Sequence, residues 1–97
     1  MKLNNKQKKY LKSLAVSLDP VVIIGKDGLT HNVVESIKLA ITAHELVKVK
    51  ALKTVSEEIN AIAIEIAADT NSEVVSIIGS TIVLYKESKK KKINLPK

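Results

Sequence analysis

The sequence contains no cysteine, so it can form neither a disulfide framework nor a cysteine-based zinc site. Long apolar runs are also missing. The N-terminal stretch MKLNNKQKKYLK lacks the roughly 7 to 15 consecutive apolar residues of a secretory signal. No segment approaches the ~20 apolar residues of a membrane-spanning helix. These absences lead us to expect a cytoplasmic protein.

Arginine, phenylalanine and tryptophan are absent as well. All sixteen basic residues are lysines, and lysine lacks the planar fork with which arginine reads a guanine edge. Tyr10 and Tyr85 are the only aromatic residues, which disfavours the paired stacking platform of an RRM or cold-shock domain. If this chain binds a polyanion, contacts to phosphate should therefore outnumber contacts to bases.

What the sequence does contain is lysine at both ends. The net charge of +6 divides into +5 over residues 1–18, −4 over residues 19–85 and +5 over residues 86–97. A length of 97 residues and a hydrophobic content of 45% suit one globular domain with a small core. An acidic middle between basic ends suggests a polyanion met at particular surfaces, and nucleic acid is the commonest such partner.

The first half of the chain alternates helical and β-rich patterns. Asn4 or Asn5 can cap a helix that runs to about Leu18, and the following Asp-Pro ends it. VVII then predicts a strand buried on both faces. A second helix is expected from an N-cap at Thr30 to His44. LVKVKALK alternates after it and predicts a half-exposed strand.

The segment INAIAIEIAAD, residues 59–69, fits both a strand and a helix. Its four alanines favour a helix, as do the capping and acidic residues before it, Thr54 or Ser56, Glu57 and Glu58. EVVSII and TIVLYK are β-rich runs joined by Gly79-Ser80, which predicts a hairpin. The order αβαβαββ then implies an α/β two-layer sandwich with a four-stranded mixed sheet.

The stretch IGKDGLT, residues 24–30, holds two of the three glycines. It falls between the first predicted strand and the second helix, where backbone N–H groups and the helix dipole can take an anion and Lys26 adds a charge. An ordinary strand-to-helix turn shows this pattern about as often. The loop is neither a Walker P-loop nor a Rossmann fingerprint, so nothing indicates nucleotide hydrolysis.

The stretch PVVIIGKDGLTHNVVESIKLAITAHELVKVK, residues 20–50, closely resembles a known family. A Pro-Val-Val strand, Gly-x-x-Gly-Leu-Thr, an amphipathic helix and His-Glu-Leu-Val-Lys-Val-Lys follow in order. They have the spacing of the CRM domain (chloroplast RNA splicing and ribosome maturation) in its stand-alone bacterial YhbY-like form. The lysine-rich first helix and VVSIIGSTIVLYK resemble its flanks, so the similarity covers about residues 3–86.

The resemblance implies a fold like that of the C-terminal domain of a bacterial translation initiation factor, with residues 59–69 helical. It also implies RNA binding, because bacterial stand-alone members are associated with precursors of the large ribosomal subunit and plant relatives act in organellar intron splicing. The family's GxxG loop is likened to that of KH domains, which clamps the nucleic-acid backbone. In this sequence that role falls on Gly25, Lys26 and Gly28.

The other candidate RNA-binding residues surround this loop or lie elsewhere in the chain. Asp27 can cap the turn or the helix, or it can face the ligand and weaken the clamp. Thr30 and His31 open the helix that follows. Five more candidates belong to the first helix and the second predicted strand, where ordinary solvation explains a lysine about as well: Lys8, Lys9, Lys12, Lys48 and Lys50.

Beyond a single domain at residues 1–86, we expect residues 87–97 to be a flexible basic tail. Its auxiliary lysines, counted with the last domain residue, are Lys86, Lys89, Lys90, Lys91 and Lys92. We expect a monomer that docks on structured RNA, specifically rRNA in precursors of the large subunit, and reads shape more than sequence. A role as a ribosome assembly factor follows from that expectation.

We expect no enzyme, cofactor or metal site. No serine, histidine and acid arrangement is legible, and His31 and His44 are spaced too widely for a metal motif. One alternative is an adaptor that grips a ribosomal protein through the acidic residues Glu57, Glu58 and Glu65. A membrane-surface protein is the weakest option, because the tail has few large apolar residues.

Overall fold

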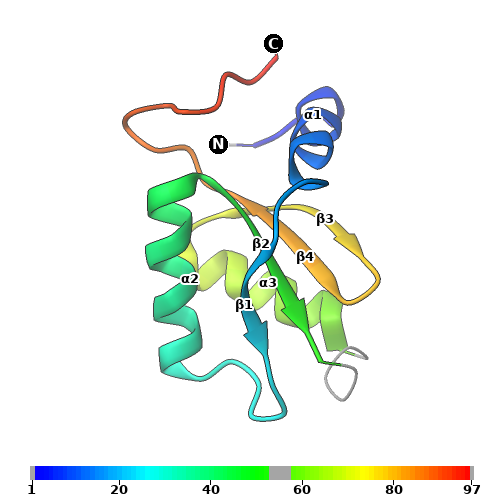
Figure 1. Cartoon of the computed structure of the whole chain (residues 1–97), viewed down its shortest axis with the longest axis vertical. Coiled ribbons are helices and arrows are strands. Elements are labelled where there is room, and N and C mark those ends of the chain that lie inside the picture. The colour runs from blue at the N-terminus through cyan, green and yellow to red at the C-terminus, as the bar shows by residue number, and fades with distance from the viewer. Residues whose placement is uncertain (1, 53–57, 97) are drawn as a thin grey trace.

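The computed structural model describes residues 2–52 and 58–96, and their elements follow the predicted order αβαβαββ. The helices are α1 (Asn5–Ala15), α2 (His31–His44) and α3 (Ile59–Thr70). The strands are β1 (Pro20–Ile24), β2 (Leu46–Ala51), β3 (Glu73–Ile78) and β4 (Thr81–Tyr85). The molecule is 38 Å long, and the two ends of the chain lie at the same end of the long axis (Figure 1).

The strands form one mixed sheet in the order β1-β2-β4-β3. β1 pairs parallel to β2, while β4 pairs antiparallel to both β2 and β3. The Gly79-Ser80 turn joins β3 to β4 as predicted, with Gly79 at a φ of 59°. This sheet and the three helices of the described residues confirm the predicted α/β fold class.

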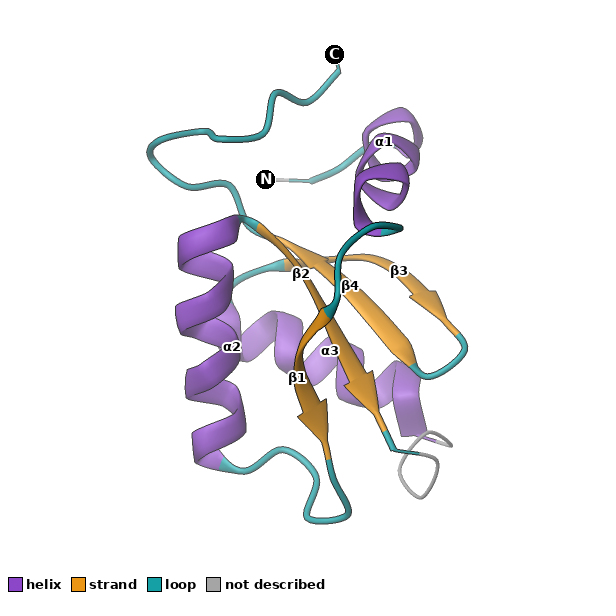
Figure 2. Ribbon diagram, in the orientation of Figure 1, coloured by secondary structure: helices purple, strands orange, loops and turns teal. Residues whose placement is uncertain are grey.

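The main core lies between the sheet and the pair α2 and α3, which cover the same face (Figure 2). The alternation of β2 is confirmed, because Val47, Val49 and Ala51 are buried in this core while Lys50 is exposed. The remaining members of the core come from β1, β4 and the two helices: Ile24, Ile82, Leu84, Ile37, Ile41, Ile62, Ala63 and Ile66.

A second, smaller core lies on the opposite face, where α1 covers one end of the sheet. Leu11 and Ala15 of α1 pack there against Leu46, Val83 and Tyr85. α1 begins where the sequence predicts, since Asn4 and Gln7 form a capping box with reciprocal hydrogen bonds of 2.8 and 3.0 Å. The helix ends at Ala15, so the prediction that it continues to about Leu18 is wrong by three residues.

The prediction that VVII is buried on both faces is also wrong. β1 is an edge strand. On the face of the sheet opposite α2 and α3, α1 covers the other end and leaves β1 open. As a result Val21 is 43% exposed and Ile23 is 60% exposed, while only Ile24 is fully buried. A short apolar run does not reveal whether one or both of its faces will be covered.

The doubtful third segment is a helix, as the alanine content and the resemblance indicate. The N-cap of α3 is Glu58, which makes no side-chain capping hydrogen bond. The proposed capping residues Thr54 and Ser56, together with Glu57, lie outside the described residues. No helix in the described ranges is long and apolar enough to cross a membrane.

Candidate nucleic-acid interface

The GKDG loop connects the buried end of β1 to the first turn of α2. The Gly28 N–H donates to the Gly25 carbonyl oxygen at 3.0 Å, which closes a tight turn. The Thr30 N–H then donates to the Gly28 carbonyl oxygen at 3.1 Å. Leu29 packs against the main core. The loop is thereby held in place at both ends, with its two inner residues exposed.

The backbone conformation differs between the two glycines of the loop. Gly28 has a φ of 71°, in the left-handed region that side-chain-bearing residues rarely adopt. Gly25 does not have a positive φ, and a Cβ placed on it would meet only the Leu52 Cδ1 atom at 3.9 Å, an ordinary contact. The backbone therefore favours glycine at position 28, whereas position 25 has no such preference.

The first turn of α2 offers unpaired backbone donors beside this loop. Thr30 is the N-cap, as predicted, and its Oγ1 accepts from the Val33 N–H at 3.2 Å. The N–H groups of His31 and Asn32 point out of the helix end, where helical geometry supplies no acceptor. With the helix dipole, these donors make a position suited to a phosphate oxygen.

Three charged or titratable side chains stand around that position. Lys26, Asp27 and His31 are all exposed. The Asp27 carboxylate makes no hydrogen bond with any described residue, and the cap of α2 is Thr30, as predicted. The carboxylate is free to orient toward or away from a ligand, and its charge offsets that of Lys26.

The lysines of β2 lie on the open face of the sheet. Lys50 is exposed and pairs in register with Ile23, one residue before the end of β1, so it belongs to the end of the sheet that carries the loop. Lys48 is partly buried, and its Nζ donates to the Leu18 carbonyl oxygen at 3.1 Å. Lys50 is therefore available to a ligand near the loop, whereas Lys48 already has a structural contact.

The lysines of α1 lie far from the loop. Lys8, Lys9 and Lys12 line one open hollow of about 520 Å³ together with Ile78. α1 and the GKDG loop stand at opposite ends of the molecule (Figure 1). The structure therefore splits the predicted binding residues into two groups, one at each end.

The C-terminal lysines join the α1 group. The segment that follows β4 lies at the end of the molecule that also carries α1 (Figure 1). Glu45, which the sequence did not single out, is fully buried there and accepts hydrogen bonds from this segment. Nothing in the sequence distinguishes this glutamate from an exposed one; only the family's His-Glu-Leu pattern drew attention to its position.

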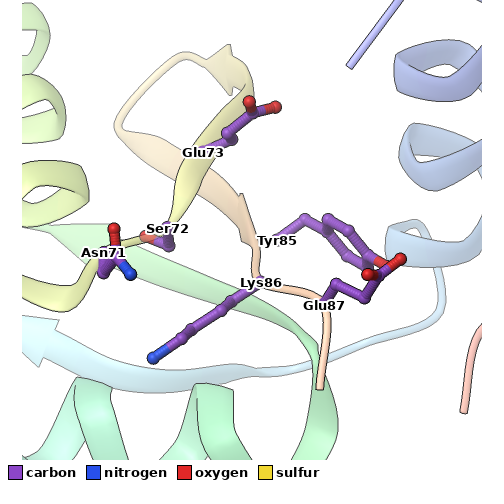
Figure 3. Close-up of a pocket in the computed structure, with 6 residues that line it drawn as sticks. All are labelled: Asn71, Ser72, Glu73, Tyr85, Lys86 and Glu87. Carbon is purple, nitrogen blue, oxygen red and sulfur yellow. The ribbon is translucent and has the colours of Figure 1, made fainter. Parts of the chain in front are cut away.

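A further hollow of about 380 Å³ at this end has a different character (Figure 3). Its lining includes the carboxylates Glu73 and Glu87, and the Leu3 N–H donates to Glu73 Oε2 at 2.9 Å. The Tyr85 hydroxyl is buried without a hydrogen-bond partner among the described residues. Burial raises the pKa of Tyr85, and the charges of Glu45 and Glu87 raise it further. Its two carboxylates outnumber the one lysine of the lining, Lys86, which makes this hollow unfavourable for a phosphate.

The two histidines stand at opposite ends of α2, about 20 Å apart at 1.5 Å per residue, so they cannot share a site. Within residues 2–52 and 58–96, no three metal-binding side chains cluster. The acidic residues of the adaptor alternative are Glu58 and Glu65, both exposed on or beside α3, and Glu57, which lies outside the described residues.

Comparison with known proteins places these features in a family. Residues 3–86 match the CRS1 / YhbY (CRM) domain. The Bacillus subtilis protein named "Probable RNA-binding protein YqeI" is 43% identical over 95 residues, which cover 97% of this chain and 99% of that protein. A Haemophilus influenzae protein named "RNA-binding protein" is 42% identical, covering 98% and 96% respectively. The solution structure of Staphylococcus aureus SAV1595 has a TM-score of 0.85 at 42% identity, covering 98% of this chain and all of that one.

Proposed function

Because the chain belongs to the CRS1 / YhbY (CRM) domain family, we propose that it binds structured RNA and holds the RNA backbone at the GKDG loop. The names of the Bacillus subtilis and Haemophilus influenzae relatives, which match over nearly their full lengths, support RNA as the ligand. The binding surface would comprise the loop, the first turn of α2, and the lysines of α1, β2 and the C-terminal segment.

The observation that carries this proposal is the geometry of the loop. A turn closed by Gly28, and followed at once by the uncapped N–H groups of His31 and Asn32, presents backbone donors and the positive end of a 14-residue helix. A phosphate oxygen suits these donors, and the glycines leave room for it to approach. Such contacts fix the position of an RNA strand without reading its bases.

The target we propose is rRNA in precursors of the large ribosomal subunit, where the protein would act as an assembly factor. A surface rich in lysine and lacking arginine suits phosphates, so the RNA would be recognised by its folded shape. Folded rRNA presents closely spaced phosphates over a large area, which is the ligand such a surface favours.

Gly28→Asp and Gly28→Asn test the loop as a matched pair. Both asparagine and aspartate tolerate a positive φ, and a Cβ at this position meets no atom within 4 Å, so the two variants share their backbone strain. Only aspartate adds a negative charge beside the expected phosphate. We expect the Asp variant to bind an rRNA hairpin roughly tenfold more weakly than the Asn variant. Fluorescence anisotropy measures the affinity, and thermal unfolding checks that both variants fold.

Sedimentation through sucrose gradients extends the same comparison to the cell. At low salt the wild-type protein should travel with large-subunit particles and leave them as salt rises. The Asn variant should be retained better than the Asp variant. If both folded variants bind RNA equally, the loop is not the anchor; if the wild-type protein stays at the top of the gradient, the ribosomal target is wrong.

A further inference from the structure

Glu45 is a buried acid at the junction between α2 and β2. Its side chain and backbone are fully shielded from solvent, and its φ of 67° is a conformation that costs free energy for a residue other than glycine. Its N–H donates to the Ile41 carbonyl oxygen at 2.9 Å, and its own carbonyl accepts from the Lys86 N–H at 2.8 Å. The backbone of Glu45 therefore ends α2 and receives the chain as it leaves β4.

The carboxylate of Glu45 holds the segment beyond β4. Its Oε2 accepts from the Ser88 N–H at 3.3 Å, from the Ser88 hydroxyl and from the Lys92 N–H at 2.9 Å, while Oε1 accepts from the Ile93 N–H at 3.0 Å. Burial alone would raise the pKa of Glu45, but these hydrogen bonds outweigh it and hold the pKa below its ordinary value of 4.5. The acid is thus charged at neutral pH, and its acceptor capacity is used by backbone and hydroxyl donors.

The same segment has an internal turn and further attachments to the domain. A turn closes between Ser88 and Lys91, whose N–H donates to the Ser88 carbonyl oxygen at 3.1 Å. The Lys92 Nζ donates to the Ala43 carbonyl oxygen at 2.6 Å, at the C-terminal end of α2. Farther along, the side chains of Ile93 and Leu95 pack against the core under α1. These contacts dock residues 86–96 on the domain.

Docking gathers the basic residues of this segment around one hollow. The hollow has a volume of about 560 Å³, and its floor is the last turn of α2 at Ile41, Thr42 and Ala43. Four lysines line it: Lys86, Lys89, Lys90 and Lys92. Among the residues that the structure describes, Glu87 is the only acid in the lining. Since the charge of Glu45 is buried and fully hydrogen-bonded, it does not expose a carboxylate to a ligand.

We propose that this hollow is a second RNA-backbone site, and that Glu45 is the positioning residue that builds it by docking residues 86–96. The inference rests on the proposed RNA binding at the GKDG loop. The two sites lie at opposite ends of α2, whose 14 residues span about 21 Å. A single RNA that contacts both must therefore be folded or long enough to cover that distance, whereas the three stacked steps of a tetranucleotide, at about 3.4 Å each, cover only ~10 Å.

Glu45→Gln tests this role, because we expect it to weaken RNA binding even though it removes a negative charge. Loss of a negative charge should by itself leave RNA affinity unchanged or raise it slightly. Glutamine, however, keeps only one of the two acceptor oxygens and replaces the other by an NH₂ group, which faces N–H donors of the segment. The segment should therefore undock, and its lysines should lose their fixed positions. We expect roughly tenfold weaker binding of a hairpin of about 20 base pairs, and a salt slope shallower by about two.

Two further variants separate docking from folding and from charge. Ser88→Ala removes one donor to Glu45 and leaves the charge and the core unchanged, so it should weaken binding in the same direction by a few-fold. Glu65→Gln makes the same charge change on the exposed surface of α3 and should leave the hairpin affinity unchanged within about twofold. Hydrogen exchange at the Lys92 and Ile93 amides reports docking directly and should accelerate only in the Glu45 and Ser88 variants.

The outcomes distinguish the two proposals. If the wild-type protein binds no RNA, the proposed function fails, and the second RNA site fails with it. If the wild-type protein binds RNA but Glu45→Gln undocks the segment without changing affinity or salt slope, only the second site is overturned. If Glu45→Gln also weakens the binding of a tetranucleotide to the same degree, the loss does not come from an RNA that contacts both sites, and the inference is wrong. If an acidic peptide binds the hollow but RNA does not, RNA is the wrong ligand class for this site.

Discussion

The two ends of the molecule are built in opposite ways. The GKDG end consists of consecutive residues, and its conformation follows from one glycine, one turn and one helix cap. The other end joins segments far apart in the sequence: Gln7 Nε2 donates to the Pro96 carbonyl oxygen at 3.1 Å, and Glu45 accepts from Ser88 and Lys92. A local site can be encoded in a few residues, but a composite one needs the whole fold.

Charge separates the two ends even more clearly. At the loop, Lys26 is offset by Asp27 in the same turn. At the other end, residues 2–12 and 86–92 carry ten of the sixteen lysines. Long-range attraction of a polyanion should therefore come from the terminal end, because summed charge governs encounter and salt dependence. The loop should contribute position, through short contacts that depend less on salt.

The largest effect is expected when charge is removed from α1. A triple Lys8→Gln, Lys9→Gln and Lys12→Gln variant should bind an RNA hairpin roughly 30-fold more weakly at moderate salt, with a slope of log affinity against log salt shallower by about three. Glutamine preserves helix propensity, so the fold should be unaffected. Affinity measured across a salt series gives both quantities.

A matched control is Lys38→Gln, which removes a lysine of α2 that forms an ion pair, with its Nζ 3.5 Å from Glu35 Oε1. It should change affinity by no more than about twofold, because an exposed paired charge contributes little. A triple variant with an unchanged salt slope would mean that the α1 lysines are ordinary solvated side chains, and that the contrast between the two ends is not one of function.

The difference between the ends also explains what the sequence could predict. Capping at Asn4 and Thr30, the alternation of β2 and the Gly79 hairpin depend on near neighbours, and all three were predicted. The exposure of Ile23 depends on how much of the open face α1 covers, which is a property of the assembled fold. Burial of Glu45 depends on residues more than forty positions away, so no local pattern reveals it.

The loop itself shows the limit of a pattern. The resemblance assigns backbone clamping to both glycines of GxxG, but only Gly28 has a positive φ. Sequence alone does not give φ. It therefore could not distinguish a glycine that the backbone conformation favours from one that only leaves room for a ligand to approach. Gly25 can therefore be changed with little structural cost, which makes it the cleaner probe of ligand approach.

A smaller effect is expected for Gly25→Ala. The new methyl group would lie 3.9 Å from Leu52 Cδ1, and no positive φ opposes it, so the free energy of unfolding should stay the same or rise by about 0.5 kcal/mol. If a phosphate approaches the backbone here, affinity for the hairpin should fall about fivefold while the salt slope stays constant. Chemical denaturation and anisotropy measure the two quantities. Equal affinity in a folded variant would show that the ligand does not approach position 25.

The smallest effect is expected for Asp27→Asn, and it has the opposite sign. Asp27 is exposed and stabilises no described contact, since Thr30 caps α2, so the substitution should leave stability unchanged. Removing its charge leaves that of Lys26 unopposed beside the expected phosphate. Two exposed unit charges at about 4 Å interact by roughly 1 kcal/mol in water, and screening reduces this, so we expect two- to threefold tighter binding. The gain should shrink as salt rises. Weaker binding would mean instead that Asp27 contacts the RNA as an acceptor, for a base amino group or a ribose hydroxyl, and the loop would then read more than phosphate.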